Sequence, residues 1–191
     1  PHAPFLYHQI PGCFMRITGG EYTNRKVVCP KGEIRPAMDR MRESMFAALG
    51  DIAGTSFLDL FSGSGVVGIE AASRGAEPVY LVEGDYRKRR TIESNISFVK
   101  REIQVKTMPV ERFLQRADRS FDLIFLDPPF PYRNKEKLIE LVCKSGALEK
   151  DGILLIHHPK EEHFADKIAS LTLFNTKSYG RSILRFYRPF P

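Results

Sequence analysis

Short apolar runs alternate with longer segments of helical period from residue 57 onward. The apolar runs are continuous rather than alternating, as in strands of a sheet that is covered on both faces. They comprise residues 57–61, 79–83, 103–107, 121–126 and 153–158. The segments of helical period comprise residues 66–74, 86–99, 110–117, 134–144 and 160–169. This order predicts an α/β, Rossmann-like fold with a doubly wound, mostly parallel sheet.

The C-terminal part of the chain departs from this order. Two strand-like runs, residues 171–177 and 181–187, are separated only by Ser178, Tyr179 and Gly180. Such a connection is too short for a crossover between parallel strands. We therefore expect an antiparallel hairpin at the end of the sheet.

The N-terminal segment has a pattern of its own. Residues 16–20 and 25–29 flank E-Y-T-N at 21–24, which predicts a small separate hairpin. A helix is expected over residues 40–49, with Asp39 as its N-cap. We interpret residues 1–14 as an extension or a cloning remnant, with Met15 as the natural start.

Composition limits the classes of protein to consider. The 191 residues fit one domain with a sizeable core, and 42% of them are hydrophobic and 27% charged. No run approaches the roughly 18 apolar residues of a membrane-spanning helix. Cys13, Cys29 and Cys143 are too far apart for a disulfide framework or a zinc site. We expect a soluble, cytoplasmic, monomeric protein without a bound metal.

Positive charge is concentrated in two parts of the chain, whose formal net charge is +6. The first group comprises Arg16, Arg25, Lys26, Lys31, Arg35, Arg40 and Arg42, and the second comprises Arg87, Lys88, Arg89, Arg90, Lys100 and Arg101. Such groups are typical of a solvated surface and of a contact with a polyanion, and the charge alone does not separate the two.

A glycine-rich loop follows the first strand of the wound sheet. The sequence L-D-L-F-S-G-S-G-V-V-G occupies residues 58–68. Gly63 and Gly65 allow a tight turn and close approach of a ligand, and Gly68 allows the helix to pack near the strand. The G-x-G-x-x-G spacing alone is a weak indication of a dinucleotide site.

Two carboxylates indicate which ligand this loop binds. Asp59 lies four residues before Gly63, where it would repel a pyrophosphate and attract an amino group or a sulfonium. Glu83 ends the next strand, where an acidic side chain can accept the ribose hydroxyls. S-adenosylmethionine has both cationic groups and no phosphate, so we favour it over NAD. The alternative is that both carboxylates only cap helix N-termini.

The strand at 121–126 ends in Asp127-Pro128-Pro129-Phe130, at the carboxyl edge of the predicted sheet. An exocyclic amine on a base attacks a methyl group poorly until acceptors hold its N–H bonds out of the ring plane. The Asp127 carboxylate and the Pro128 carbonyl can be these acceptors, since two prolines fix the backbone direction. Phe130 can stack on an extruded base. Without the glycine loop, the same tetrapeptide could simply end a strand.

From about Met15 to Tyr187 the sequence resembles the bacterial 16S rRNA guanine-N2 methyltransferases of the RsmD type. The resemblance is carried by M-R-I-T-G-G, R-P-A-M-D-R-M-R-E-S-M-F, the glycine loop, D-P-P-F and K-S-Y-G-R-S-I-L-R-F-Y. It implies a class I methyltransferase fold with a seven-stranded sheet. It also implies that the enzyme methylates one guanine of small-subunit rRNA and converts S-adenosylmethionine to S-adenosylhomocysteine. The rRNA would be bound within the small subunit or its assembly intermediate.

The resemblance assigns roles to positions of this chain. It implies an N-terminal hairpin and helix at 15–50 for RNA contact and a methyltransferase domain at 51–191. Base-binding and catalytic residues would be Asp127, Pro128, Pro129 and Phe130. Cofactor-binding residues would be Asp59, Phe61, Ser62, Gly63, Ser64, Gly65, Glu83, Val110, Arg40 and Glu43. RNA-binding residues would be Arg16, Arg25, Lys26 and Arg35.

Two departures from the family pattern bear on the cofactor. Ala37-Met38 stands where relatives usually have Thr-Thr or Thr-Ser, so a hydroxyl contact near the cofactor or the RNA is missing. T-M-P-V-E at 107–111 lacks the Asp or Asn that binds the adenine amino group, which leaves the backbone N–H of Val110 as a contact. The second departure implies weaker cofactor affinity than is typical of the family.

Three other functions remain as alternatives. A DNA adenine-N6 methyltransferase shares D-P-P-F, but nothing in the chain resembles an added target-recognition domain. A non-catalytic RNA-binding assembly factor would not need the stereochemistry of Asp127 to Phe130. A NAD-dependent dehydrogenase is the weakest alternative. His157-His158 has no evident third ligand, so we expect a role at the sheet edge rather than a metal site.

Overall fold

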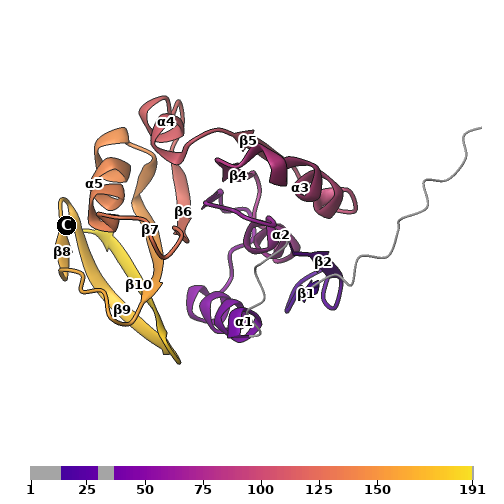
Figure 1. Ribbon diagram of the computed structural model, residues 1–191, viewed down its shortest axis with the longest axis horizontal. Coiled ribbons are helices and arrows are strands. Elements are labelled where there is room, and N and C mark those ends of the chain that lie inside the picture. Colours follow the sequence, from indigo (N-terminus) through magenta and orange to yellow (C-terminus); the bar gives the residue numbers. More distant parts are fainter. Residues whose placement is uncertain (1–13, 30–36, 191) are drawn as a thin grey trace, which may run out of the picture.

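The main sheet has eight strands in the order β5-β4-β3-β6-β7-β10-β9-β8 (Figure 1). The computed structural model describes residues 14–29 and 37–190. The strands are β3 (Phe57–Leu60), β4 (Val79–Glu83), β5 (Ile103–Thr107), β6 (Phe121–Leu126), β7 (Leu148–Pro159), β8 (Lys167–Ile168), β9 (Leu171–Tyr179) and β10 (Ser182–Pro189). Strands β3 to β7 pair in parallel, whereas β10, β9 and β8 are added antiparallel. The predicted mostly parallel sheet with a C-terminal antiparallel hairpin is confirmed, but the sheet has eight strands rather than the seven that the resemblance implies.

Strand β8 lies within residues 160–169, where the sequence predicted a helix, so that prediction is wrong. In this segment Phe164 and Ile168 are buried, and Tyr187 donates a hydrogen bond to the Ala165 carbonyl. Lys167 and Ile168 instead pair with β9 through a tight turn at Ala169, whose φ is 50°. Two apolar side chains bury too little area to hold a helix against the sheet, and pairing with β9 satisfies the backbone instead.

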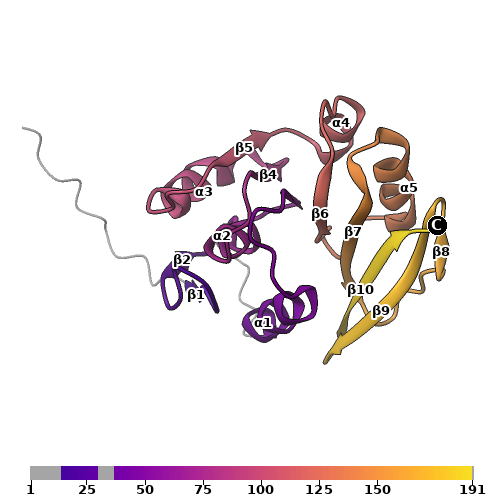
Figure 2. The same ribbon diagram turned by 180° about the vertical axis from the view of Figure 1, so that it is seen from behind.

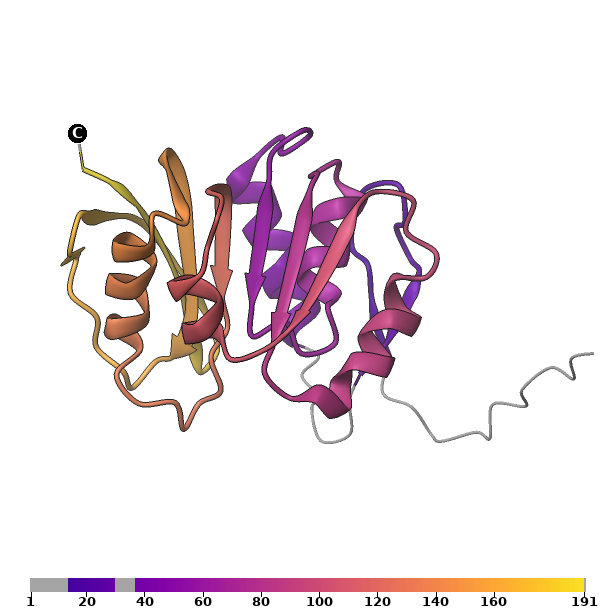
Figure 3. The same ribbon diagram turned by 90° about the horizontal axis from the view of Figure 1, so that it is seen from above.

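Helices cover both faces of the sheet (Figure 3). They are α1 (Ala37–Leu49), α2 (Val66–Ser73), the 3-10 turn η1 (Tyr86–Lys88), α3 (Arg89–Ile96), α4 (Val110–Gln115) and α5 (Lys135–Ser145). Helices α1, α2 and α3 pack on one face, and α4 and α5 pack on the other. Side chains of β3 alternate between the faces, so Phe57 points toward α1 and Leu58 toward α4 and α5.

Asp39 is not the N-cap that the sequence predicted. Helix α1 begins at Ala37, which places Asp39 in its first turn. There its carboxylate pairs with Arg42 across 2.8 Å, one turn along the same helix.

A two-stranded hairpin of β1 (Phe14–Arg16) and β2 (Lys26–Val28) lies beside α2, separate from the main sheet (Figure 2). Its connection approaches α2 closely: the backbone N–H of Glu21 donates to the Ser73 carbonyl over 2.7 Å. A Cβ at Gly20 would lie 2.0 Å from that carbonyl oxygen, so only glycine fits there. Ile17 and Val27 are fully buried in the core that α1 and α2 share. The hairpin is therefore packed into the core and is not a loose appendage.

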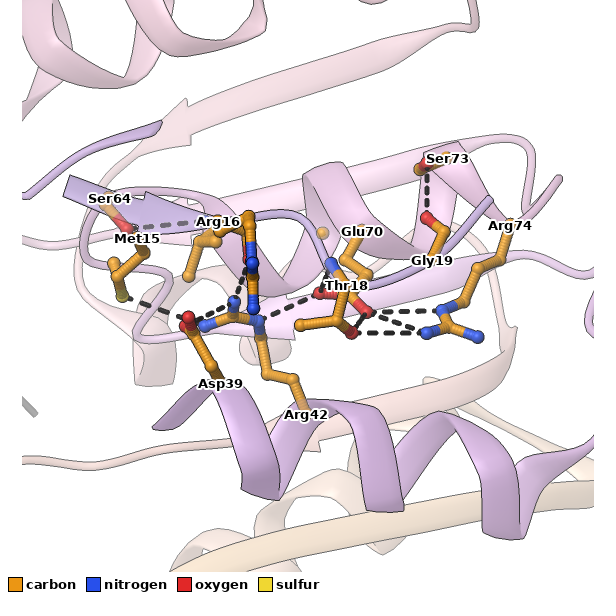
Figure 4. A network of polar contacts seen from close by, with 12 residues as sticks. Met15, Arg16, Thr18, Gly19, Asp39, Arg42, Ser64, Glu70, Ser73 and Arg74 are labelled. Atoms are coloured by element: carbon orange, nitrogen blue, oxygen red, sulfur yellow. Dashed lines mark hydrogen bonds and ion pairs between the residues drawn. The ribbon is translucent and has the colours of Figure 1, made fainter. Parts of the chain in front are cut away.

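A buried ion network joins the hairpin, α1 and α2 (Figure 4). The guanidinium of Arg42 pairs with Glu70 across 2.9 Å, and both side chains are fully buried. Arg42 also donates to the Arg16 carbonyl, while Thr18 and Arg74 donate to Glu70. Because every charge here has a partner, the network fixes the hairpin against the helix that follows the glycine loop.

None of the helices in the described part of the chain is both long and apolar enough to span a bilayer.

Candidate active site

The glycine loop turns sharply at the carboxyl end of β3. Phe61, Gly63 and Gly65 all have positive φ, at 65°, 56° and 80°. The Gly65 N–H donates to the Ser62 carbonyl over 2.7 Å, and the Ser62 N–H donates to Val82 of β4 over 3.0 Å. The loop is therefore a defined backbone turn, anchored to the neighbouring strand.

Glu83 fastens this loop from the end of β4. One carboxylate oxygen accepts the Gly63 N–H and the other accepts the Asp85 N–H, each over 2.8 Å. The ammonium of Lys88 lies 3.6 Å from the same carboxylate. Each carboxylate oxygen has two acceptor sites, so Glu83 retains the capacity to accept ribose hydroxyls.

Asp59 has one satisfied and one unsatisfied oxygen. Its Oδ2 accepts the Gly68 N–H in the first turn of α2 over 3.0 Å, so the capping role considered from the sequence is present. Its Oδ1 is buried without a hydrogen-bond partner among the described residues. Burial raises the pKa of Asp59 well above 3.8, and the charges of Asp127 and Glu83 add to the effect, although the Gly68 N–H opposes it. A cationic ligand that binds Oδ1 would offset the free-energy cost of ionising the buried carboxyl group.

The Asp127–Phe130 segment forms a second corner beside the glycine loop. Strand β6 pairs with β3, and the Asp127 N–H donates to the Leu60 carbonyl over 3.3 Å. The Asp127 side chain is partly exposed, Pro128 is buried, and Pro129 and Phe130 are exposed. The exposed Phe130 ring can therefore reach a base that comes from outside.

Both corners open into one cavity of about 290 Å³. Its lining comprises Met15, Met38, Asp59, Phe61, Ser62, Gly63, Ser64, Val66, Val67, Glu83, Lys88, Phe125, Asp127, Pro128, Pro129, Phe130 and Pro131. Its charged lining consists of three acidic side chains, Asp59, Glu83 and Asp127, and one ammonium, that of Lys88, so acidic groups outnumber basic ones and the cavity suits a cation. The structure therefore brings together the two motifs that the sequence placed in separate loops.

Aromatic and cationic contacts hold the second corner. The rings of Phe61 and Tyr132 meet edge to face with centroids 5.4 Å apart, which joins the two loops directly. The buried ammonium of Lys135 donates to the carbonyls of Phe130 and Tyr132, each over 3.1 Å, and pairs with Glu162. Burial and the hydrogen bond that Tyr132 donates to Glu111 raise the pKa of Tyr132 above its ordinary value. The corner is thus rigid on the side away from the cavity.

His157 is a site residue whose contact was not predicted. Its Nδ1 lies 2.8 Å from Asp127 Oδ1, and its side chain is 2% exposed. The strand register explains the contact, because Leu126 pairs with Ile156 and the next residues on both strands are therefore neighbours. Within the described residues no group of His, Cys, Asp and Glu side chains is arranged to hold a metal.

Several residues assigned by resemblance lie away from the cavity lining. Arg40 and Glu43 are exposed on α1, and Met38 and Met15 line the cavity instead. Val110 is buried at the start of α4, and Gly65 shapes the loop without lining the cavity. Arg16, Arg25 and Lys26 are exposed on or beside the hairpin, whereas Arg35 lies outside the described residues.

The acceptor groups in this cavity fit S-adenosylmethionine. The unpaired Asp59 Oδ1 suits an ammonium group, Glu83 suits ribose hydroxyls, and the side chains of Met15 and Met38 supply apolar contact. A pyrophosphate would meet three carboxylates and is disfavoured. The fold, the glycine loop and the Asp127–Phe130 corner together define a class I methyltransferase.

The chain belongs to the family described as Conserved hypothetical protein 95, whose sequence profile matches residues 15–188. It is similar to YlbH of Bacillus subtilis, provisionally named an rRNA methyltransferase, with 32% identity over 91% of this chain and 98% of the relative. It is 30% identical to ribosomal RNA small subunit methyltransferase D of Escherichia coli, over 91% of this chain and 89% of the relative. The solved structure of Escherichia coli yhhF, provisionally described as a methyltransferase, superposes with a TM-score of 0.84 and 28% identity, over 94% of this chain and 99% of the other.

Proposed function

We propose that this protein methylates the exocyclic N2 amine of one guanine in small-subunit (16S) ribosomal RNA, with S-adenosylmethionine as the methyl donor. The observation that carries the proposal is the single cavity lined by both the glycine loop and the Asp127–Phe130 corner. The relatives named as small-subunit rRNA methyltransferases support rRNA as the substrate class.

The cofactor would be held by the residues of the first corner. Asp59 would accept from the amino group of the methionine moiety and Glu83 from the ribose, and Ser62, Gly63 and Ser64, which line the cavity, would lie against the ligand. When bound, S-adenosylmethionine supplies a methyl group on a positively charged sulfur. Phe61 and Val67 line the cavity and would exclude water from the reacting groups once both ligands are bound.

The base would be held by the residues of the second corner. Phe130 stacks on the extruded guanine, and Asp127 Oδ2 and the Pro128 carbonyl accept the two N2 hydrogens. These two hydrogen bonds turn the nitrogen lone pair out of the ring plane and toward the methyl group. When the methyl group passes from sulfur to N2, the nitrogen would become acidic and would lose a proton to Asp127 or water, and S-adenosylhomocysteine would be released.

The rest of the RNA would contact the N-terminal hairpin. The guanidinium of Arg25 lies 4.8 Å from the Phe98 ring centroid and the ammonium of Lys26 lies 5.8 Å from that of Phe14, so each cation lies over an aromatic ring. Such a combination binds phosphates and unstacked bases without reading sequence. The proposal includes a monomer that acts in the cytoplasm on the assembling subunit or its rRNA.

One assay tests this function against its rivals. The protein is incubated with tritiated donor and three substrates: undermethylated small subunits, naked rRNA and duplex DNA. We expect label in the small-subunit RNA, released on digestion as N2-methylguanosine and mapped to one position by primer extension. Label only in DNA would support adenine-N6 methylation instead. Tight RNA binding without any label would support the assembly-factor alternative.

A further inference from the structure

His157 and Asp127 form a buried pair on neighbouring strands of the sheet. The distance from His157 Nδ1 to Asp127 Oδ1 is 2.8 Å, and the two side chains are 2% and 26% exposed. A carboxylate that is ionised can only accept hydrogen bonds, so this contact places Nδ1 as the donor if it is to hold the carboxylate of Asp127. His157 therefore holds the Asp127 carboxylate through Oδ1, and the Asp127 side chain also lines the cavity.

The contact satisfies one oxygen of Asp127 and leaves the other available. Oδ1 is occupied by His157, and no described residue donates a hydrogen bond to Oδ2. A carboxylate without such an anchor rotates about its side-chain bonds, and its oxygens then point toward the acceptor nitrogen only part of the time. With Oδ1 fixed, Oδ2 keeps one direction.

The adjacent residue His158 has a different environment from His157 and does not hydrogen-bond to Asp127. His158 points to the opposite face, where its Nδ1 is 2.8 Å from the Pro159 carbonyl and its ring lies 4.2 Å from that of Phe164. The two residues have the same side chain and similar burial, and they are adjacent in the chain. Only His157 contacts a residue of the cavity, so His158 provides a matched control.

We propose that His157 is a positioning residue for methyl transfer: it donates from Nδ1 to Asp127 and thereby aims Asp127 Oδ2 at the amine that is methylated. The inference rests on the proposed function, because it assigns Asp127 to the acceptor base. His157 touches neither substrate nor cofactor in this account, and it acts only through Asp127.

The first test uses variants that differ in where they place a donor. His157→Asn puts an amide N–H near the position of Nδ1, whereas His157→Gln puts it near the position of Nε2. We expect His157→Ala and His157→Gln to lower kcat by about tenfold to hundredfold, and His157→Asn to recover most of the loss. The KM for RNA and the Kd for S-adenosylmethionine should be unchanged in all three, and His158→Asn should keep the kcat of the wild type.

A second measurement does not depend on turnover. Long-range ¹H–¹⁵N correlation NMR on the histidines reports which ring nitrogen carries the proton. We expect His157 to be protonated at Nδ1 in the wild type and to move its proton to Nε2 in Asp127→Ala. This signal remains readable if a His157 variant fails to fold.

Three results would overturn the inference. They are an unprotonated Nδ1 in the wild type, a kcat of His157→Ala within about twofold of the wild type, or equal losses in the Asn and Gln variants. Failure of the proposed function would look different. The wild type would then label no guanine of rRNA, the kinetics would be run on whichever substrate it does label, and the NMR result would still report the pair.

Discussion

The carboxylate of Glu83 accepts the backbone N–H of Gly63 across 2.8 Å, from the end of one strand to the loop after its neighbour. A second backbone donor, the N–H of Asp85, occupies the other oxygen over the same distance. Glu83 therefore sets the shape of the loop before any ligand arrives. The ribose contact that we propose for Glu83 and its contacts with the loop therefore involve the same carboxylate.

Glu83→Ala should weaken the binding of S-adenosylmethionine by about tenfold to hundredfold, because hydrogen bonds to a charged group are lost from both the loop and the ligand. Isothermal titration calorimetry measures the Kd. Glu77→Ala is the matched control, since Glu77 also accepts a backbone N–H, from Glu102 over 3.0 Å, but lies before β4 and away from the cavity. Equal losses in both variants would contradict a local role for Glu83.

Asp59→Asn should stabilise the ligand-free protein at neutral pH. Burial raises the pKa of Asp59 in the folded state above its unfolded value of 3.8. The stability linked to its protonated form is therefore fully present below pH 3.8 and is lost as pH rises through the raised pKa. An uncharged amide removes this loss, so urea unfolding should show a higher midpoint for the variant at pH 7 and a smaller difference at pH 4.

The same variant should lose affinity for the cofactor. An ammonium group favours ionised Asp59, so binding by the wild type should strengthen as pH rises through the raised pKa and release a proton. Calorimetry in two buffers of different ionisation enthalpy detects that proton. Measurements stay below about pH 7, where an α-amino group remains protonated. If Asp59→Asn bound the cofactor as well as the wild type, the amino contact would be wrong.

The buried pair of Arg42 and Glu70 should dominate the stability of the N-terminal region. Glu70→Ala leaves a fully buried guanidinium without its main partner, which costs about 3–5 kcal/mol. Glu93→Ala is the control, because its pair with Arg89 joins two half-exposed side chains one helical turn apart and is worth about 0.3–0.5 kcal/mol. Chemical unfolding of both variants gives the two values. A similar cost for both would show that the network is not central to the fold.

Charge reversal of Arg25 and Lys26 should weaken RNA binding more at low salt than at high salt. Both side chains are exposed on the hairpin, and salt screens their attraction to phosphates. Fluorescence anisotropy with small-subunit rRNA at two salt concentrations measures the effect. Reversal of Lys144 and Lys150, exposed at the far end of α5 and on β7, is the control. A loss that is independent of salt would point to misfolding.

The sequence predicted the strands well because each is a continuous apolar run. The bounds of β4, β5 and β6 agree with the predicted ranges. It failed for residues 160–169, where pairing with β9 outweighs a helical pattern that has only two buried apolar side chains. Local pattern decides an element only when tertiary contacts do not compete.

The site was predictable as two motifs but not as a set of contacts. Asp59, Glu83 and Asp127 follow from their positions at strand ends, since parallel strands end at one edge of the sheet. The His157 contact requires the register between β6 and β7, which no local pattern contains. The sequence did contain a signal for which face of α1 is turned inward, because Met38, Met41 and Met45 recur at helical spacing. Arg40 and Glu43 lie off that face and do not line the cavity.

Methyl transfer by Asp127→Ala tests the central claim most directly. The claim is that the corner after β6 presents an amine to a methyl group held by the loop after β3. We predict that the variant transfers tritium to small-subunit RNA about a hundredfold to a thousandfold more slowly than the wild type. Its affinities for RNA and S-adenosylmethionine should remain close to normal, and Asp151→Ala, an exposed control, should be fully active. Unchanged turnover by Asp127→Ala would contradict the account.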